Sequence, residues 1–132
     1  MAMRTSLPAI RLGALYALAV FAAGFVLGAV RTLVIAPRFG DLIAVGIELP
    51  IILAVSWVVF GGLARGPMSS KWLVGLVAFL VLIALELALS AVIADGGVTV
   101  FLANWLTLAG TIGLVGQIAF ALIPLVHPAA RN

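Results

Sequence analysis

Long apolar runs separated by short polar segments dominate the chain. Four of these runs are about as long as, or longer than, the roughly 20 residues that a helix needs to cross the hydrocarbon core of a bilayer. They predict transmembrane helices over residues 12–36, 42–64, 72–94 and 98–126. Because the connections are short, consecutive helices must run in opposite directions. The pattern therefore predicts an all-α polytopic membrane protein, with residues 1–132 forming one antiparallel up-down bundle of four transmembrane helices.

The composition supports this class and excludes others. Hydrophobic residues make up 66% of the 132 residues and charged residues only 8%, whereas a soluble domain carries roughly a quarter charged residues. The seven Lys and Arg residues are scattered singly near expected helix ends, so the basic balance indicates contact with the lipid bilayer and not nucleic-acid binding. The absence of cysteine excludes disulfides and thiolate metal sites.

Basic residues also predict the orientation in the membrane, because Lys and Arg near helix ends are preferentially kept on the cytoplasmic side. Five of the seven lie in the N-terminal tail, in the connection between the second and third runs and in the C-terminal tail, whereas Arg31 and Arg38 lie near the first connection. We expect a bacterial inner-membrane protein with both termini cytoplasmic.

The first run is longer than the roughly 7 to 15 apolar residues of a signal peptide, so we expect a retained helix.

Four charged residues stand in mirror order around the first connection: Arg31, Arg38, Asp41 and Glu48. Both basic residues precede the turn, and both acidic residues follow it. Residues equidistant from a hairpin turn face each other, so we expect ion pairs between Arg31 and Glu48 and between Arg38 and Asp41. Charge inside an apolar segment is costly enough to require a partner or a function.

A layer of polar residues is expected at one depth of the bundle. Helical rise places Glu48, Glu86 and Asn104 roughly 9 to 12 Å below the outer ends of their helices, with Arg31 at a similar level. These four side chains, from four different helices, are the candidate ligands of an ion or solute. Glu86 has no basic partner of its own, so we expect a neutral acid that donates a hydrogen bond to Asn104. The alternative is an ionised Glu86 that shares Arg31 with Glu48.

Pro50 affects the same region of the second expected helix. It cannot donate to the carbonyl group of Gly46, so that oxygen is free and the helix is expected to kink. One interpretation is a small polar pocket that combines this carbonyl with the polar layer. The other is an ion-pair network that only fixes the register of the helices.

Small residues mark expected helix contacts. Gly24 and Gly28 form a G-x-x-x-G pattern, and Gly110 and Gly113 belong to a second stripe. Such residues allow helix backbones to approach closely, either within the bundle or between copies in a homo-oligomer or a larger membrane complex. Gln117 lies on the second stripe and is expected to face another protomer or lipid.

The sequence contains no motif for catalysis, for a metal or for a cofactor. His127, the single histidine, lies far from the acidic layer, and metal sites need several converging ligands. The chain has no Glu-x-x-His metal pattern, no Ser-His-Asp set and no phosphate-binding glycine loop. We therefore expect no metal, no cofactor and no catalytic residue, and enzyme activity is the least favoured class.

The first hairpin carries G-x-x-x-G-x-x-R, then P-x-x-G, then E-x-P. These elements are Gly24, Gly28, Arg31, Pro37, Gly40, Glu48 and Pro50. In this pattern the chain resembles a group of small bacterial four-helix integral membrane proteins to which no activity is assigned. The resemblance implies the architecture and a specialised hairpin, and it implies no reaction.

Three functions fit these observations. The favoured one is transport, conduction or binding of a small ion or solute by the polar layer in the outer third of the membrane, because ionisable groups within a membrane mark functional sites. The second is an accessory or assembly subunit of a larger membrane complex, favoured by the short connections and the glycine stripes. The third is a membrane enzyme that acts on a lipid or quinone-like substrate.

Overall fold

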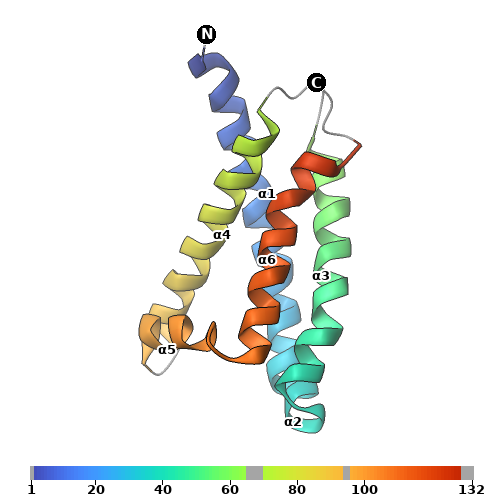
Figure 1. The fold of residues 1–132 in the computed structure, drawn as a ribbon, viewed down its shortest axis with the longest axis vertical. Coiled ribbons are helices and arrows are strands. Elements are labelled where there is room, and N and C mark those ends of the chain that lie inside the picture. Colours follow the sequence, from blue (N-terminus) through green and yellow to red (C-terminus); the bar gives the residue numbers. More distant parts are fainter. Residues whose placement is uncertain (1, 65–69, 94–95, 129–132) are drawn as a thin grey trace.

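The computed structural model of this chain describes residues 2–64, 70–93 and 96–128. Every regular element in these ranges is a helix, and the helices stand side by side as a bundle (Figure 1). The elements are α1 (Ala2–Val30), the π-helical turn η1 (Arg31–Ile35), α2 (Ala36–Phe39), α3 (Asp41–Leu63), α4 (Lys71–Ile93), α5 (Gly97–Asn104) and α6 (Leu108–Val126). The predicted all-α four-helix bundle is confirmed.

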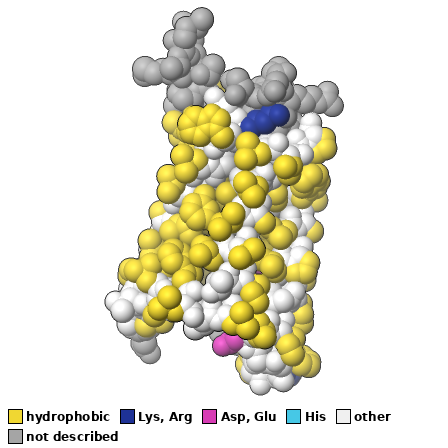
Figure 2. All heavy atoms as spheres, viewed as in Figure 1, with side chains coloured by type: hydrophobic (Ala, Val, Ile, Leu, Met, Phe, Trp, Pro, Cys, Tyr) yellow, Lys and Arg dark blue, Asp and Glu magenta, His cyan; other side chains and the backbone are white. Residues whose placement is uncertain are grey.

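Four segments are long and apolar enough to cross a membrane: Pro8–Phe39, Asp41–Leu63, Lys71–Ile93 and Leu108–Val126. On the face shown in Figure 2, hydrophobic side chains cover the surface between the two ends, while basic and acidic atoms lie only near opposite ends. A bundle in water would place apolar side chains inside and charged ones outside. This distribution is that of a multi-pass membrane protein.

The four long helices are arranged as a ring. α1 packs against α3 and α4, and α6 packs against the same two helices. We call the end at which α1 begins and α6 ends the terminal end, and the end that carries α2 and α5 the hairpin end (Figure 1). Successive long helices alternate in direction between these two ends, as the short connections predict.

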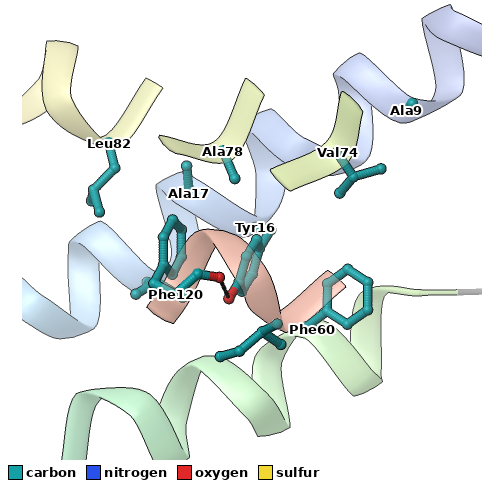
Figure 3. Packing of buried hydrophobic residues seen from close by; sticks show 10 residues of the cluster. Ala9, Tyr16, Ala17, Phe60, Val74, Ala78, Leu82 and Phe120 are labelled. Carbon is teal, nitrogen blue, oxygen red and sulfur yellow. Dashed lines mark hydrogen bonds between the residues drawn. The ribbon is translucent and has the colours of Figure 1, made fainter. Parts of the chain in front are cut away.

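A buried tyrosine joins the two helices that face each other across this ring. Tyr16 of α1 is fully buried, and its hydroxyl group donates a 2.8 Å hydrogen bond to the carbonyl oxygen of Phe120 in α6 (Figure 3). That oxygen is free because its ordinary helical partner would be residue 124, and Pro124 has no N–H group. The Tyr16 ring stacks on Phe120 at 4.4 Å and meets the edge of Phe60 at 5.3 Å. The core therefore satisfies a carbonyl group that neither lipid nor water could reach.

Glycines set the closest helix contacts, but at positions other than the G-x-x-x-G pair. A Cβ atom added to Gly75 of α4 would collide with the carbonyl oxygen of Ala121 in α6, and one added to Gly116 would collide with Leu49 of α3. A Cβ atom added to Gly24 would be 3.7 Å from Ile52, which is an ordinary contact. At Gly28 the nearest such atom, at 3.8 Å, belongs to Arg31 of the same chain segment, and at Gly113 nothing lies within 4 Å.

The first helix continues past its expected end at residue 36. Ala36 keeps helical backbone angles, φ −61° and ψ −39°, and its N–H group bonds to the carbonyl oxygen of Arg31, five residues earlier. The wider π turn accommodates Pro37, whose ring would crowd the carbonyl group of Leu33 in a regular α-helix. The helix ends only at Gly40, where φ is 87°.

The last expected helix, residues 98–126, is instead two helices. α5 ends at Asn104, and α6 begins after Thr107, whose extended backbone has φ −84° and ψ 158°. The Thr107 hydroxyl oxygen accepts a 3.0 Å hydrogen bond from the N–H group of Gly110, and the Thr111 hydroxyl group donates one of 2.8 Å to the carbonyl oxygen of Trp105. The hydroxyl groups of Thr107 and Thr111 thus stabilise the turn before α6, and Thr107 is its N-cap residue.

Candidate functional site

The Arg31–Glu48 ion pair predicted from the mirror order is present. Nε of Arg31, at the start of η1, lies 2.6 Å from Oε2 of Glu48 on α3. The arginine side chain is 35% exposed and the glutamate side chain 20% exposed in the isolated bundle. Nε is itself buried, and its alignment with Glu48 is that of an ion pair and not of a hydrogen bond. The pair ties the first and second membrane-spanning segments together.

A second polar contact joins the other two long helices. Nε2 of Gln117 on α6 donates a 2.5 Å hydrogen bond to Oε2 of Glu86 on α4, and both residues are half-buried. The other polar atom of the amide, Oε1 of Gln117, is buried and has no hydrogen-bond partner among the described residues. Buried polar atoms without partners are rare in folded proteins and call for an explanation.

These two contacts belong to one group of side chains, which we call the polar cluster: Arg31, Glu48, Glu86 and Gln117. Glu86 lies close enough to interact electrostatically with both Arg31 and Glu48. From the helix bounds, Glu48 and Glu86 lie about 10 Å from the hairpin-end termini of α3 and α4. Each of the four membrane-spanning segments contributes one member. The predicted convergence of polar groups at one depth thus occurs, with Gln117 in place of Asn104.

The charges of the polar cluster do not balance if both carboxyl groups are ionised. The positive charge of Arg31 is paired with Glu48, and the group that donates to Glu86 is a neutral amide. The other charged side chains that the structure describes lie nearer the ends of the membrane-spanning segments, and they are Arg11, Arg38, Asp41 and Lys71. The polar cluster then carries one net negative charge inside an apolar bundle. Such a charge requires a compensating cation, either a proton or a metal ion.

Asn104 does not belong to the polar cluster, so this part of the sequence-based site is wrong. It is exposed at the end of α5, and its Oδ1 accepts a 3.3 Å hydrogen bond from the Thr107 hydroxyl group. α5 contacts α4 and α6, and within the described residues it makes no contact with α1 or α3. The interruption of the helix between α5 and α6 places Asn104 away from the bundle axis. The expected hydrogen bond from Glu86 to Asn104 is replaced by the one from Gln117.

The expected ion pair between Arg38 and Asp41 is also absent, although both residues lie in the part of the chain that the structure describes. Both are exposed, and no ion pair joins them. Exposed pairs contribute little because solvent screens them. Arg38 occupies the last turn of α2 and Asp41 the first turn of α3, so each charge is already stabilised by the dipole of its own helix end.

The carbonyl group of Gly46 does not join the polar cluster either. α3 runs unbroken through Pro50, and Gly46 and Pro50 both lie on its exposed face. A Cβ atom added to Gly46 would meet nothing within 4 Å. Glu48 is half-buried and lies on the other side of the helix. The pocket expected from the Pro50 kink is therefore not formed, and the polar cluster consists of side chains alone.

The remaining candidates from the sequence, His127 and Gly110, are in packing contacts. His127 lies at the terminal end, where its ring packs at 4.2 Å on Trp57 and at 5.3 Å on Phe60. The described residues include no group of three or more His, Cys, Asp or Glu side chains that could hold a metal ion. Gly110 packs against the backbone of Asn104, which explains why a glycine follows the break before α6.

A groove on the surface is a weaker candidate than the polar cluster. It lies between α4 and α6, has a volume of about 260 Å³, and is lined by apolar residues that include Trp72, Phe79 and Leu125. Ligand sites combine an apolar wall with a few polar groups that orient the ligand. Apart from the indole N–H group of Trp72, the side chains that line this groove are apolar, so it fits lipid contact better than specific recognition.

Gln117 is the functional candidate that the sequence analysis misplaced. Depth along the fourth run was counted from residue 98, which favoured Asn104 and assigned Gln117 to an outer stripe. Threonine is a preferred N-cap residue, and a helix starting after Thr107 would have placed Gln117 about 14 Å inside the bundle.

No protein-family model, no curated protein and no solved structure matches the chain. The resemblance of the first hairpin to a group of small bacterial membrane proteins remains a prediction.

Proposed function

We propose that this multi-pass membrane protein binds a small cation at the polar cluster and carries it through the bilayer. The observation that supports this most strongly is the position of Glu86. Its carboxyl group lies within the bundle, receives a hydrogen bond from a neutral amide, and is close to an arginine that is already paired with another glutamate. An intramembrane carboxyl group without a cation of its own is the usual mark of an ion pathway.

The Arg31–Glu48 pair has a supporting role in this proposal. It holds the first two membrane-spanning segments in register and places a positive charge near Glu86. This positive charge repels a cation bound at Glu86 and so weakens its binding, which prevents the site from binding so tightly that it cannot release. Conduction and transport require a site of this intermediate strength.

We further propose that the protein resides in the bacterial inner membrane with both termini cytoplasmic. The distribution of basic residues supports this orientation, because five of the seven lie in the two tails and the second connection. The hairpin end, and with it the polar cluster, would then lie toward the outer side of the membrane.

The experiment is a flux assay on purified protein in liposomes. Gradients of H⁺, Na⁺ and K⁺ are imposed in turn, a counter-ion pathway that does not carry the tested ion prevents a charge build-up, and a trapped dye reports each ion. We expect the wild type to dissipate at least one gradient faster than empty liposomes. Glu86→Gln should return that rate to the level of empty liposomes because the amide cannot become ionised.

Asp41→Asn is the matched control, since it also converts one acid to its amide but at an exposed position outside the polar cluster. It should keep the wild-type rate. If the folded wild type dissipates none of the three gradients, the transport proposal is wrong. Stable copurification with larger membrane proteins would then favour the accessory-subunit function.

A further inference from the structure

The amide group of Gln117 is oriented for one protonation state of its partner. An ionised carboxylate can only accept hydrogen bonds, and the Gln117 amide presents its donor, Nε2, to Oε2 of Glu86. The acceptor of the same amide, Oε1, is left buried with no hydrogen-bond partner among the described residues. The observed arrangement therefore fits Glu86 in its ionised form.

Uptake of a proton by Glu86 would add a hydrogen-bond donor to the carboxyl group. The proton forms an O–H bond on one carboxyl oxygen while the other oxygen can still accept, and the new O–H group needs an acceptor, which an amide nitrogen cannot be. A half-turn of the amide about its terminal side-chain bond exchanges Nε2 and Oε1 without changing the shape of the side chain. Glu86 could then donate to Oε1, which has no partner in the observed state. Gln117 can thus form a hydrogen bond with Glu86 in both of its protonation states, whereas an apolar residue could form none.

The surroundings favour a proton over a metal ion as the cation. Hard metal cations take six or more oxygen ligands, and no group of three or more His, Cys, Asp or Glu side chains that could hold a metal ion occurs among the described residues. Arg31 acts electrostatically on Glu86, and the Gln117 amide directs its N–H group at the carboxylate. A proton needs only one acceptor oxygen, and the carboxylate supplies it.

We propose that the cation bound by the polar cluster is a proton and that the Gln117 amide rotates by half a turn as Glu86 takes up and releases it. This inference rests on the proposed function and names its substrate. Gln117 is a positioning residue, because it acts through Glu86. The charged groups that act on Glu86 are Arg31 from η1 and Glu48 from α3. Of the helices that pack on α4, α5 and α6 contain no charged residue, and the described charged side chain of α1 is Arg11, near the terminal end.

Gln117 is the single glutamine of the chain, which makes a site-specific test practical. Cell-free synthesis with glutamine labelled by ¹⁵N in the side-chain amide places the label at Gln117 alone. NMR of the full chain in lipid nanodiscs then follows this amide during a pH titration. We expect the amide resonance to move with pH as its hydrogen bond to the carboxylate is lost. Asp41→Asn should show the same titration. In Glu86→Gln the pH-dependent shift of the Gln117 resonance should be absent, because the carboxyl group is removed. The resonance of the added glutamine is identified by comparison with the wild-type spectrum.

Two results would overturn the inference. One is a Gln117 resonance in the folded wild type that does not move across the pH titration. The other is a resonance that moves at fixed pH when choline is replaced by Na⁺ or K⁺, which would show a metal ion at the site. The flux assay separates this inference from the proposed function. A Glu86-dependent flux of Na⁺ would leave the function standing and refute the proton, whereas a titrating Gln117 with no flux would refute transport alone.

Discussion

The Arg31–Glu48 ion pair and the Glu86 carboxyl group have different roles in the same cluster. Arg31 and Glu48 neutralise each other at 2.6 Å and join two segments of one hairpin. Glu86 has a neutral partner, Gln117, and so its charge can change without breaking an ion pair. In the proposed function the ion pair stabilises the bundle, and the carboxyl group with a neutral partner binds the cation.

Breaking the ion pair should therefore destabilise the fold. Arg31→Ala or Glu48→Ala leaves one charge unpaired, and the loss should approach about 3 kcal/mol, the lower end for buried pairs, because the arginine is 35% exposed. The double variant Arg31→Glu, Glu48→Arg should recover part of that loss. Unfolding by denaturant in detergent micelles measures all three variants. A double variant no more stable than the worse single variant would contradict the pairing.

At the scale of helices, two prolines have opposite consequences. Pro124 frees the carbonyl group of Phe120, which receives a hydrogen bond from Tyr16, whereas Pro50 frees the carbonyl group of Gly46 on the exposed face of α3. Only the first is satisfied by a side chain of the core. Tyr16 therefore links α1 to α6 through a group that a regular helix would not offer.

This link predicts a coupling between Tyr16 and Pro124. Tyr16→Phe should cost about 1 to 3 kcal/mol because it leaves a buried carbonyl group unsatisfied. In a Pro124→Ala background the new N–H group of residue 124 can bond to that carbonyl, so the same change should cost less. A double-mutant cycle of unfolding free energies measures the difference. An equal cost of Tyr16→Phe in both backgrounds would exclude this explanation of the tyrosine.

The contact between α4 and α6 predicts a pair of glycine variants with different outcomes. Gly75→Ala should destabilise the bundle, because its methyl group would collide with the carbonyl oxygen of Ala121. Gly113→Ala adds the same group to α6 where nothing lies within 4 Å, and alanine in a helix is favoured by up to about 1 kcal/mol. Thermal unfolding in micelles should rank Gly75→Ala below the wild type and Gly113→Ala at or above it. The reverse order would show that α4 and α6 pack differently.

The sequence predicted the parts of the structure that depend on long patterns. Four apolar runs identify four membrane-spanning segments, and mirror positions around Gly40 identify the Arg31–Glu48 pair. The prediction from the sequence failed where hydrogen bonds of a few backbone groups determine a helix boundary. The cap at Thr107 ends one helix and starts another, and this removes Asn104 from the polar cluster and brings in Gln117. Such a break depends on local hydrogen bonds that compete with an equally apolar continuous helix.

For the molecule as a whole, the proposed orientation predicts that both ends of the chain are cytoplasmic. Even numbers of membrane crossings return the chain to its starting side, and the described structure has four candidate crossings. A phosphatase reporter fused after Asn132 should be inactive in cells, and one inserted at Gly40 should be active, because the enzyme works only outside the cytoplasm. Activity of the C-terminal fusion alone would show the opposite orientation.

In the proposed function one carboxyl group, that of Glu86, binds the cation within the polar cluster. The most direct measurement is the rate of cation flux per folded protein in liposomes for Glu86→Gln, compared with Asp41→Asn in the same preparation. We predict that Glu86→Gln falls to the rate of empty liposomes while Asp41→Asn keeps the wild-type rate, since Glu86 lies in the polar cluster and Asp41 does not. Equal rates for the two folded variants would contradict the claim.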